Sequence, residues 1–399
     1  MSGMNFLEKL LDGAAVEWKP LVEVVLSTSN IKWKNTDRVY RYIDLTSVTI
    51  ETKKIAETIE ITANNAPSRA QKLVEKDDVI FATTRPTQQR YCLIDNEYSG
   101  AVASTGYCIL RAKKDEVLPK WILYCIASSD FKIYVEENQS GSAYPAISDT
   151  KVKDFLIPIP PLAIQAEIVR ILDTFTELTT ELTTELTLRQ KQYEYYRDRL
   201  LTFAEGEVEW KTLEQISTYS KTRISSDKVN SSNYVGVDNL LQNRAGKIAS
   251  NYVPTEGNLT EYRHNDILIG NIRPYLKKIW FADCIGGTNG DVLVIHLMDE
   301  SVNPKYLYQV LADDKFFDYN MQHSKGAKMP RGNKEKIMKY QVAIPSFEEQ
   351  SRIVAILDKF DTITNDLSVG LPREIALRQQ QYEYYRDLLL SFPPPLTPP

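Results

Sequence analysis

Short segments in both halves of the chain combine arginine, lysine, glutamine or asparagine with aromatic residues. Such side chains suit the reading of DNA, because arginine can bind guanine, and glutamine or asparagine can bind adenine, through two hydrogen bonds each. Lysine mostly contacts phosphates, which positions a protein without reading sequence. The candidate DNA-binding residues are Lys32, Lys34, Arg85, Gln88, Gln89, Arg90, Lys221, Arg223, Asn271, Arg273, Tyr275, Lys277, Lys278, Lys325, Lys328 and Arg331.

The correspondence between the two halves strengthens this interpretation. Arg85-Pro86 and Arg273-Pro274 each follow a strand-like run, and the segments 141–145 (GSAYP) and 326–330 (GAKMP) also correspond. Any single basic cluster could equally be a solvated loop, and the two glycine segments could be structural turns that precede the next long helix. The hypothesis of a shared role therefore depends on the pairing of positions between the halves.

Signatures of catalysis are absent from the sequence. It contains no glycine-rich phosphate loop, no GxSxG and no methyltransferase motif of the adenine-modifying kind. Asp44, followed by Glu51 and Lys53, loosely resembles a metal-dependent nuclease motif, but such spacings arise by chance among 53 acidic residues. The three histidines and four cysteines are dispersed, which predicts neither a metal site nor disulfides. We therefore expect a binding protein whose chemistry lies in its partners.

Length and charge limit this interpretation further. A chain of 399 residues is long for one hydrophobic core, so two or more domains are expected. The net charge of −5 is unusual for a DNA-binding protein, so its positive charge must be local or a partner must supply the rest. The sequence shows neither an apolar run long enough for a membrane span nor a signal peptide, which predicts a cytoplasmic protein without membrane contact.

The elements that must position these residues come from an internal repeat. Residues 165–175 (QAEIVRILDTF) match 350–360 (QSRIVAILDKF), and 189–198 (RQKQYEYYRD) match 378–387 (RQQQYEYYRD). Both copies have helical periodicity, which predicts two long helices that pack on each other. The N-terminal run FLEKLLDGAAVEW resembles the exit of the first helix, YRDRLLTFAEGEVEW. This order indicates a circularly permuted duplication.

The repeat suggests a division of the chain into alternating domains and helices. Each domain is expected to be α+β, with strands first and one helical stretch near 119–136 or 303–319. The predicted parts are 1–17 (a helix fragment that completes the second half-repeat), 18–158 (first domain), 159–205 (first helical spacer), 206–343 (second domain), 344–392 (second helical spacer) and 393–399 (a disordered, proline-rich tail).

The two predicted helical spacers differ. The first carries TELT three times, at 176–179, 180–183 and 184–187. Adding or deleting one such unit would move the flanking domains by about 6 Å along the helix and rotate them by about 40° about its axis. The whole helix, with some 38 residues, would span roughly 57 Å. The alternative is a repetitive helix surface without a role. The second spacer contains Gly370-Leu-Pro372, where glycine suits a helix C-cap and proline a first turn, so we expect a break.

The YEYYRD blocks allow two interpretations. Tyr193 and Tyr196 are expected to pack between the helices, whereas residues on other faces could meet a partner protein. The sequence does not separate these alternatives for the individual side chains. The candidate partner-docking residues are Tyr195, Arg197, Asp198, Tyr384, Arg386 and Asp387.

Taken together, these blocks resemble a known family. The runs IPIPPLAIQAEIVRILDTF and AIPSFEEQSRIVAILDKF, the TELT units and the paired YEYYRD ends are similar to specificity subunits of Type I restriction–modification enzymes, in particular the IC class. The resemblance implies an α+β fold, with two similar target recognition domains separated by two long antiparallel helices in a pseudo-two-fold, circular arrangement. Each recognition domain would read one half of a bipartite, asymmetric DNA sequence, and the helices would set the gap between the halves.

The resemblance also implies partners. The helices would dock two DNA methyltransferase (modification) subunits, and restriction/translocase subunits would join that core on double-stranded DNA. The chain would not be an enzyme by itself and would hold no cofactor, because S-adenosylmethionine, ATP and Mg²⁺ would belong to the partner subunits. The alternatives are a protein-binding scaffold with twin domains and a self-contained DNA-modifying enzyme.

Overall fold

The computed structural model describes residues 6–204, 206–366 and 368–393. The chain forms two compact units, unit 1 (residues 1–179 and 378–399) and unit 2 (residues 180–377). Each unit joins one α+β domain to segments of the long helices. The predicted tail lies outside the described residues except for Pro393, as do residues 1–5. Within the described ranges, no helix is both long and apolar enough to cross a lipid bilayer.

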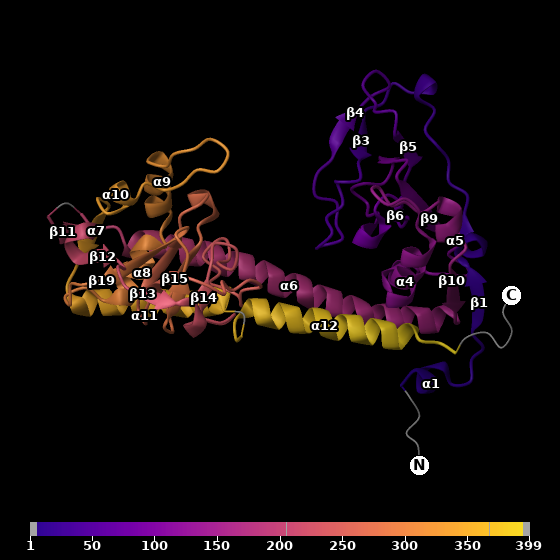
Figure 1. The fold of residues 1–399 in the computed structure, drawn as a ribbon. Coiled ribbons are helices and arrows are strands. Elements are labelled where there is room, and N and C mark those ends of the chain that lie inside the picture. The colour runs from indigo at the N-terminus through magenta and orange to yellow at the C-terminus, as the bar shows by residue number, and fades with distance from the viewer. Residues whose placement is uncertain (1–5, 205, 367, 394–399) are drawn as a thin grey trace, which may run out of the picture. The chain divides into compact units, whose positions relative to one another are not determined.

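In unit 1, two four-stranded sheets have the strand orders β4-β3-β8-β5 and β2-β9-β6-β7, and β1 pairs with β10 in antiparallel fashion (Figure 1). The strands are β1 (Glu17–Pro20), β2 (Val25–Leu26), β3 (Tyr40–Ile43), β4 (Ile59–Ile61), β5 (Ala70–Leu73), β6 (Val79–Ala82), β7 (Tyr91–Leu93), β8 (Val102–Ser104), β9 (Tyr107–Ala112) and β10 (Leu156–Ile159).

Unit 2 has the same two-sheet architecture, but in its first sheet β14 of the parallel pair is an edge strand, whereas β3 of unit 1 is flanked by β4. Its sheets have the orders β13-β15-β18-β14 and β12-β19-β16-β17, and β11 pairs with β20. The strands are β11 (Glu209–Thr212), β12 (Ser217–Tyr219), β13 (Arg223–Ser225), β14 (Tyr234–Val235), β15 (Asn258–Tyr262), β16 (Ile267–Gly270), β17 (Ile279–Phe281), β18 (Gly286–Thr288), β19 (Val292–Leu297) and β20 (Gln341–Ile344). In both units one pair, β3 with β8 and β14 with β18, is parallel.

The central strand β6 shows why these apolar runs form buried strands. Alternate side chains of a strand point to opposite faces. Val79 and Phe81 accordingly pack in the hydrophobic cluster that contains Trp121, whereas Ile80 and Ala82 pack in a second cluster on the other face. Because both faces are covered, all four residues are buried and the run is continuously apolar.

Each domain follows its strands with a pair of short helices where the sequence predicted one. In unit 1 these are α3 (Pro119–Ala127) and α4 (Ser129–Asn138), and in unit 2 α8 (Pro304–Leu311) and α9 (Asp314–Gln322). The prediction of a single helix was wrong because Ser128 and Asp313 have extended backbones and cap the second helix through their side chains. The remaining short helices are α1 (Phe6–Leu11), α2 (Leu21–Val24), α5 (Asp149–Lys153), α7 (Leu213–Ile216) and α10 (Lys334–Ile337).

The first long helix, α6 (Leu162–Leu200), is continuous over 39 residues and includes all three TELT units. The second is divided into α11 (Phe347–Asn365) and α12 (Leu371–Leu390), as expected. Gly370, however, is not the C-cap of α11 but directly precedes α12. Its N–H donates to the carbonyl of Asp366 at 3.0 Å, and a Cβ there would lie 2.4 Å from the carbonyl oxygen of Thr362. Glycine is therefore needed for close backbone approach.

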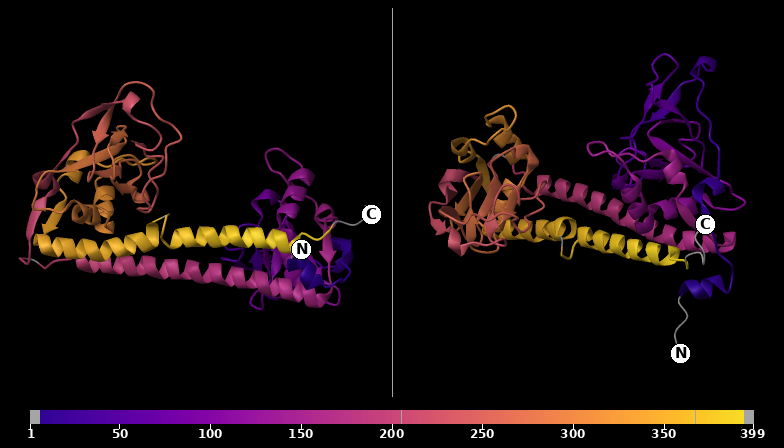
Figure 2. Two further views of the ribbon diagram at one scale, coloured as in Figure 1. Left: turned by 90° about the horizontal axis from the view of Figure 1, so that it is seen from below. Right: turned by 45° about the vertical axis from the view of Figure 1, so that its right-hand side comes forward.

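The long helices pack through equivalent aromatic pairs in both units. In unit 1, where α12 runs alongside the first half of α6 (Figure 2), Phe175 stacks on Tyr385 with ring centroids 5.4 Å apart. In unit 2, Phe360 of α11 stacks on Tyr196 of α6, also at 5.4 Å. Because Phe175 matches Phe360 and Tyr385 matches Tyr196 in the repeat, the two contacts are equivalent by the internal repeat.

A buried glutamine joins each long helix to its domain. Gln165 of α6 accepts the N–H of Leu118 at 2.9 Å and donates to the carbonyls of Glu116 and Pro160. Gln350 of α11 makes the same three hydrogen bonds with Asn303, Ser301 and Pro345. Both glutamines are fully buried, so their amides satisfy backbone groups that water does not reach.

The N-terminal segment contacts the end of the C-terminal helix within unit 1. Leu7 of α1 lies in the same hydrophobic cluster as Leu389 and Leu390 of α12. The indole of Trp18 in β1 donates to the carbonyl of Pro393 at 2.8 Å. Unit 1 thus combines chain segments from the two extremes of the sequence, which is the arrangement a permuted duplication requires.

Candidate nucleic-acid interface

In unit 1, a strained turn follows β6. Arg85 has φ 49° and Gln89 has φ 50°, and between them lies the 3₁₀ helix Pro86–Gln88. We call residues 85–89 the Arg–Pro turn of unit 1. Left-handed backbone in residues other than glycine is costly and persists only where its surroundings hold it. Here the N–H of Arg85 donates to the carbonyl of Pro145 at 2.7 Å.

That carbonyl belongs to the glycine loop of unit 1, residues 140–146. Ser140 and Ala146 exchange two backbone hydrogen bonds of 2.9 Å across the loop, and Ala146 also bridges to Thr84, next to the Arg–Pro turn. The two segments singled out separately in the sequence therefore form one surface.

Unit 2 contains the same construction. Its Arg–Pro turn, residues 273–277, begins at Arg273 with φ 53° and ends at Lys277 with φ 50°. The N–H of Arg273 donates to the carbonyl of Pro330 at 2.7 Å, and the glycine loop 325–331 is closed by hydrogen bonds between Lys325 and Arg331. The backbone frame is thus the same in both units.

The side chains on these frames differ. In unit 1, Arg85 and Gln88 are exposed, and the Arg85 guanidinium lies 5.4 Å from the ring centroid of Tyr144. Tyr144 is 72% exposed and was not among the predicted residues. Its place between the glycine and the proline of the glycine loop could have identified it, because an exposed aromatic ring beside an arginine is suited to contact bases.

In unit 2, Met329 occupies the place of Tyr144, and half of its surface is exposed. Arg273, Tyr275, Lys325 and Lys328 are also exposed there. Arg331 is exposed as well, but it pairs with the carboxylate of Asp291 at 3.0 Å. This surface is richer in cations than its counterpart in unit 1.

Several predicted residues have their side chains engaged within the chain. Lys278 is buried and donates to the carbonyl of Val237 at 2.6 Å, and burial lowers its pKa. Arg90 donates to the carbonyl of Val48. Asn271, two residues before the Arg–Pro turn, is buried, and its side-chain oxygen has no hydrogen-bond partner among the described residues. Lys278 and Arg90 therefore support backbone carbonyls within the unit rather than present their charges to DNA.

Gln89 and Lys277 occupy matching C-terminal positions of the two turns. The carbonyl of Gln89 accepts a hydrogen bond from Lys53, whose ammonium lies 4.6 Å from the ring centroid of Tyr91. Burial lowers the pKa of Lys53 to about 8, and this residue was not predicted to support the turn. Lys277 pairs with Asp314 at 2.8 Å.

The other predicted residues lie on separate elements. Lys32 and Lys34 are exposed on either side of Trp33, whose indole donates to the carbonyl of Ala70 at 2.9 Å. Lys221 is exposed beside β13, and Arg223, within that strand, donates to the hydroxyl of Thr260 at 2.8 Å.

The predicted docking residues divide into two groups. Tyr195 and Tyr384 occupy matching positions and are 58% and 64% exposed. Arg197 and Arg386 are buried and lie over the rings of Tyr193 and Tyr382, respectively, so their contacts are internal. We therefore correct the expectation for the two arginines.

The matching aspartates of these blocks contact their own unit. Asp198 pairs with Lys315 at 2.7 Å, and Asp387 accepts hydrogen bonds from Ser129. A partner protein would find these carboxylates already occupied.

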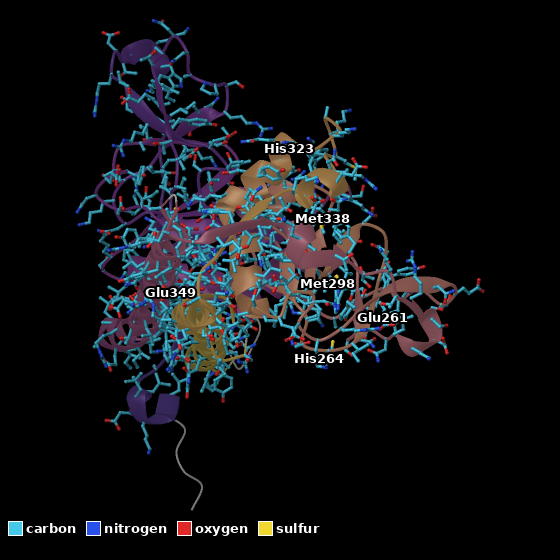
Figure 3. All side chains as sticks on the ribbon, turned by 90° about the vertical axis from the view of Figure 1, so that its left-hand side faces the viewer. Glu261, His264, Met298, His323, Met338 and Glu349 are labelled. Carbon is cyan, nitrogen blue, oxygen red and sulfur yellow. The ribbon has the colours of Figure 1, made fainter. Side chains whose placement is uncertain are left out.

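No group of three or more metal-binding side chains occurs in the part of the chain that the structure describes. His264 and His323 lie on different parts of unit 2 (Figure 3). The residues of the nuclease-like pattern also have separate partners, because Asp44 accepts from the hydroxyl of Tyr42 whereas Lys53 contacts Gln89.

Comparison with known proteins decides the family. The sequence matches the family described as "Type I restriction modification DNA specificity domain" twice, over residues 17–189 and 206–377. The chain belongs to this family of Type I specificity subunits. The specificity subunit is 34% identical over 415 residues to the "Type I restriction enzyme EcoR124I/EcoR124II specificity subunit" of Escherichia coli, with 100% of this chain and 99% of the relative covered.

Two further similarities agree. A "putative type I restriction enzyme specificity subunit" of Haemophilus influenzae is 28% identical, with 97% of this chain and 98% of the relative covered. The fold resembles a chain from a study of complex assembly and conformational transition of the type I R-M system, with a TM-score of 0.60, 21% identity, and coverage of 94% of this chain and 97% of that one. The specificity subunit is the non-catalytic part of such a system, so neither a self-contained enzyme nor a scaffold is favoured.

Proposed function

We propose that each domain reads one half of a bipartite, asymmetric DNA site through its Arg–Pro turn and glycine loop. The observation that carries this proposal is the repetition of one backbone frame with different side chains. Arg85 and Arg273 have the same left-handed backbone and the same hydrogen bond to a proline carbonyl. Tyr144 is replaced by Met329, and Thr87 by Tyr275. A common frame that presents different side chains to a groove would read two different half-sites.

The long helices would set the gap between the half-sites and dock two DNA methyltransferase subunits. The exposed tyrosines Tyr195 and Tyr384 support this, because they are equivalent by the repeat and suit a symmetric pair of partners. S-adenosylmethionine would belong to those subunits, and ATP and Mg²⁺ to restriction/translocase subunits that join them. With a net charge of −5, the chain alone would bind DNA weakly, and the partners would contribute phosphate contacts.

The test is methylome sequencing of a host that carries the specificity subunit with its modification subunit. Arg85→Ala should relax one half-site and leave the other unchanged, whereas Arg273→Ala should do the reverse. Each should cost about 1–3 kcal/mol of discrimination if the arginine binds a guanine. A matched control is Arg41→Ala, because Arg41 is an exposed arginine of unit 1 that pairs with Glu97 at 2.6 Å, outside the Arg–Pro turn.

The control should leave the motif intact. The proposal fails if either arginine variant alters both half-sites together, or if both variants methylate the original motif as efficiently as the parent.

A further inference from the structure

Unit 2 contains a buried arginine that lacks an acidic partner. Arg197 of α6 is only 4% exposed, and its guanidinium lies 4.0 Å from the ring centroid of Tyr193. Among the described residues, its Nε has no hydrogen-bond partner and no carboxylate pairs with it. A buried guanidinium without an anionic partner costs free energy, because burial removes its hydration and no carboxylate replaces the lost water.

The equivalent arginine in unit 1 is paired. Arg386 contacts the carboxylate of its neighbour Asp387 at 2.8 Å and the hydroxyl of Ser129 at 3.4 Å. In unit 2 the matching carboxylate, Asp198, instead pairs with Lys315 at 2.7 Å. Unit 1 has Asp130 at the position of Lys315, so no lysine competes for its carboxylate. A second difference is that Asp314 stands at the position of Ser129, whose backbone N–H and hydroxyl donate to Asp387 in unit 1. These two substitutions between the copies accompany the unpaired Arg197.

Two more cations gather beside Arg197. A cavity of about 240 Å³ is lined by Arg197, Arg244 and Lys277, together with Gln190, Tyr193, Glu194, Asn243, Thr364 and Asn365. Arg244 is buried, donates to the carbonyl of Ala312 and shares the carboxylate of Asp314 with Lys277. The nearby acids are Glu194 in the lining, Asp314, which pairs with two of the cations, and Asp313, Asp318 and Asp361, whose charges act on the same cations. Among the described residues, none of these carboxylates forms an ion pair with Arg197.

The pKa values of two of these cations are lowered, in part by the charge of a neighbouring cation. Burial, and then the nearby charge of Arg197, lowers the pKa of Arg244 to about 10. Burial, and then the charge of Arg244, lowers the pKa of Lys277. The three cations therefore repel one another, and an anion placed among them would relieve that repulsion.

We propose that this cavity binds an oxyanion of the phosphate class, either free phosphate or one phosphodiester of bound DNA. Its volume is several times the share of one water molecule in the liquid, so a phosphate group fits. Arginine and lysine donors around a concave site are suited to phosphate oxygens. Lys277 ends the Arg–Pro turn of unit 2, which places the cavity beside the proposed DNA-reading surface. Phosphate binding in this cavity does not require that the Arg–Pro turn of unit 2 reads a DNA half-site.

The first test measures binding of inorganic phosphate to the full-length chain by isothermal titration calorimetry, at constant ionic strength with chloride as the reference anion. Lys277→Met removes one cation from the cavity and should weaken binding about tenfold, as expected for the loss of a charge-assisted hydrogen bond. Lys315→Met leaves the lining intact but frees Asp198 to neutralise Arg197, as Asp387 neutralises Arg386, and should weaken binding to a similar degree.

Lys339→Met is the matched control. Lys339, like Lys315, is an exposed lysine of unit 2 with one carboxylate partner, Glu214 at 2.5 Å, but it does not line the cavity. It should bind phosphate as the parent does. The proposal is overturned if the parent does not bind phosphate, if it binds acetate in preference to phosphate, or if the Lys277 and Lys315 variants bind it undiminished.

A second arm separates the two sources of the oxyanion. In the complex with the modification subunit, the salt dependence of binding to duplex DNA should fall by about one charge in Lys277→Met if the occupant is a phosphodiester. An unchanged slope together with phosphate binding identifies free phosphate. Methylome sequencing of the same variant tests the proposed function separately, because an intact bipartite motif shows that sequence reading stands whether or not the cavity binds phosphate.

Discussion

Replacing the buried glutamine near the start of either repeated helix, Gln165 in α6 or Gln350 in α11, should release that helix from its domain. Gln350→Ala removes three hydrogen bonds, to the N–H of Asn303 at 2.7 Å and to the carbonyls of Pro345 and Ser301 at 2.9 and 3.0 Å. Each intramolecular hydrogen bond contributes about 1 kcal/mol, and each backbone group left buried without a partner costs about 1–3 kcal/mol. Because water can enter part of the space that the side chain leaves, we expect a loss of about 3–5 kcal/mol in the stability of unit 2.

Hydrogen exchange measured by mass spectrometry is the suitable assay, because two units need not unfold together. Faster exchange should be confined to the start of α8 and the residues before α11 in Gln350→Ala. In Gln165→Ala it should be confined to the start of α3 in unit 1. Gln341→Ala is the control, because Gln341 is an exposed glutamine of β20.

The reasoning is refuted if Gln350→Ala is destabilised by less than about 1 kcal/mol, the value of a single ordinary hydrogen bond. It is equally refuted if the two variants affect the same segments, since each glutamine joins its helix to a different domain.

Two other predictions concern the helix and the support of the first Arg–Pro turn. Deleting residues 180–183 from α6 should leave both half-sites unchanged and shorten the gap between them by one or two base pairs. The reason is that the helix loses about 6 Å, whereas one base pair rises about 3.4 Å. Methylome sequencing that showed altered half-sites with the original gap would contradict this prediction. The pKa of Lys53 is about 8 in the folded chain against a usual value of 10.5, so the unfolded chain binds more protons between these values and stability rises with pH there. Lys53→Met should remove that part of the rise between about pH 8 and 10 in urea unfolding, and an identical pH dependence in parent and variant would show that Lys53 is not responsible.

The sequence predicted those features that depend on local pattern. The repeated apolar spacing indicated the long helices, and Gly370-Leu-Pro372 marked the break that separates α11 from α12. The continuous apolar spacing around Ser128 and Asp313 concealed the short breaks between α3 and α4 and between α8 and α9. These breaks depend on side-chain caps, which a polar residue within an apolar pattern signals only weakly.

The candidate interface could be predicted only in part, because it depends on contacts between distant segments. Arg85 and Arg273 were identified from their positions after strands. Their hydrogen bonds to the glycine loops join residues about 60 positions apart, which neither segment indicates. Arg197 was a candidate docking residue because it lies in a YEYYRD block, whose buried and exposed faces the sequence did not separate. It is buried because the ring of Tyr193 covers it, a contact that helical spacing allows but does not require.

The duplication supplies a physical comparison within one chain. Where the two copies keep the same side chain and the same contacts, as with Gln165 and Gln350 or the ion pairs of Lys120 and Lys305 with the helices, the residues fix how a helix meets a domain. Where the frame is kept but the side chain changes, the change alters what the surface can bind rather than how it folds. Where unit 1 has Ser129 and Asp130, unit 2 has Asp314 and Lys315; Lys315 pairs with Asp198, and Arg197 is left without an ion pair among the described residues, whereas Arg386 pairs with Asp387. In the same way, Arg85 and Arg273 are kept in both turns. The residues beside them differ, so each turn presents different side chains to what it binds.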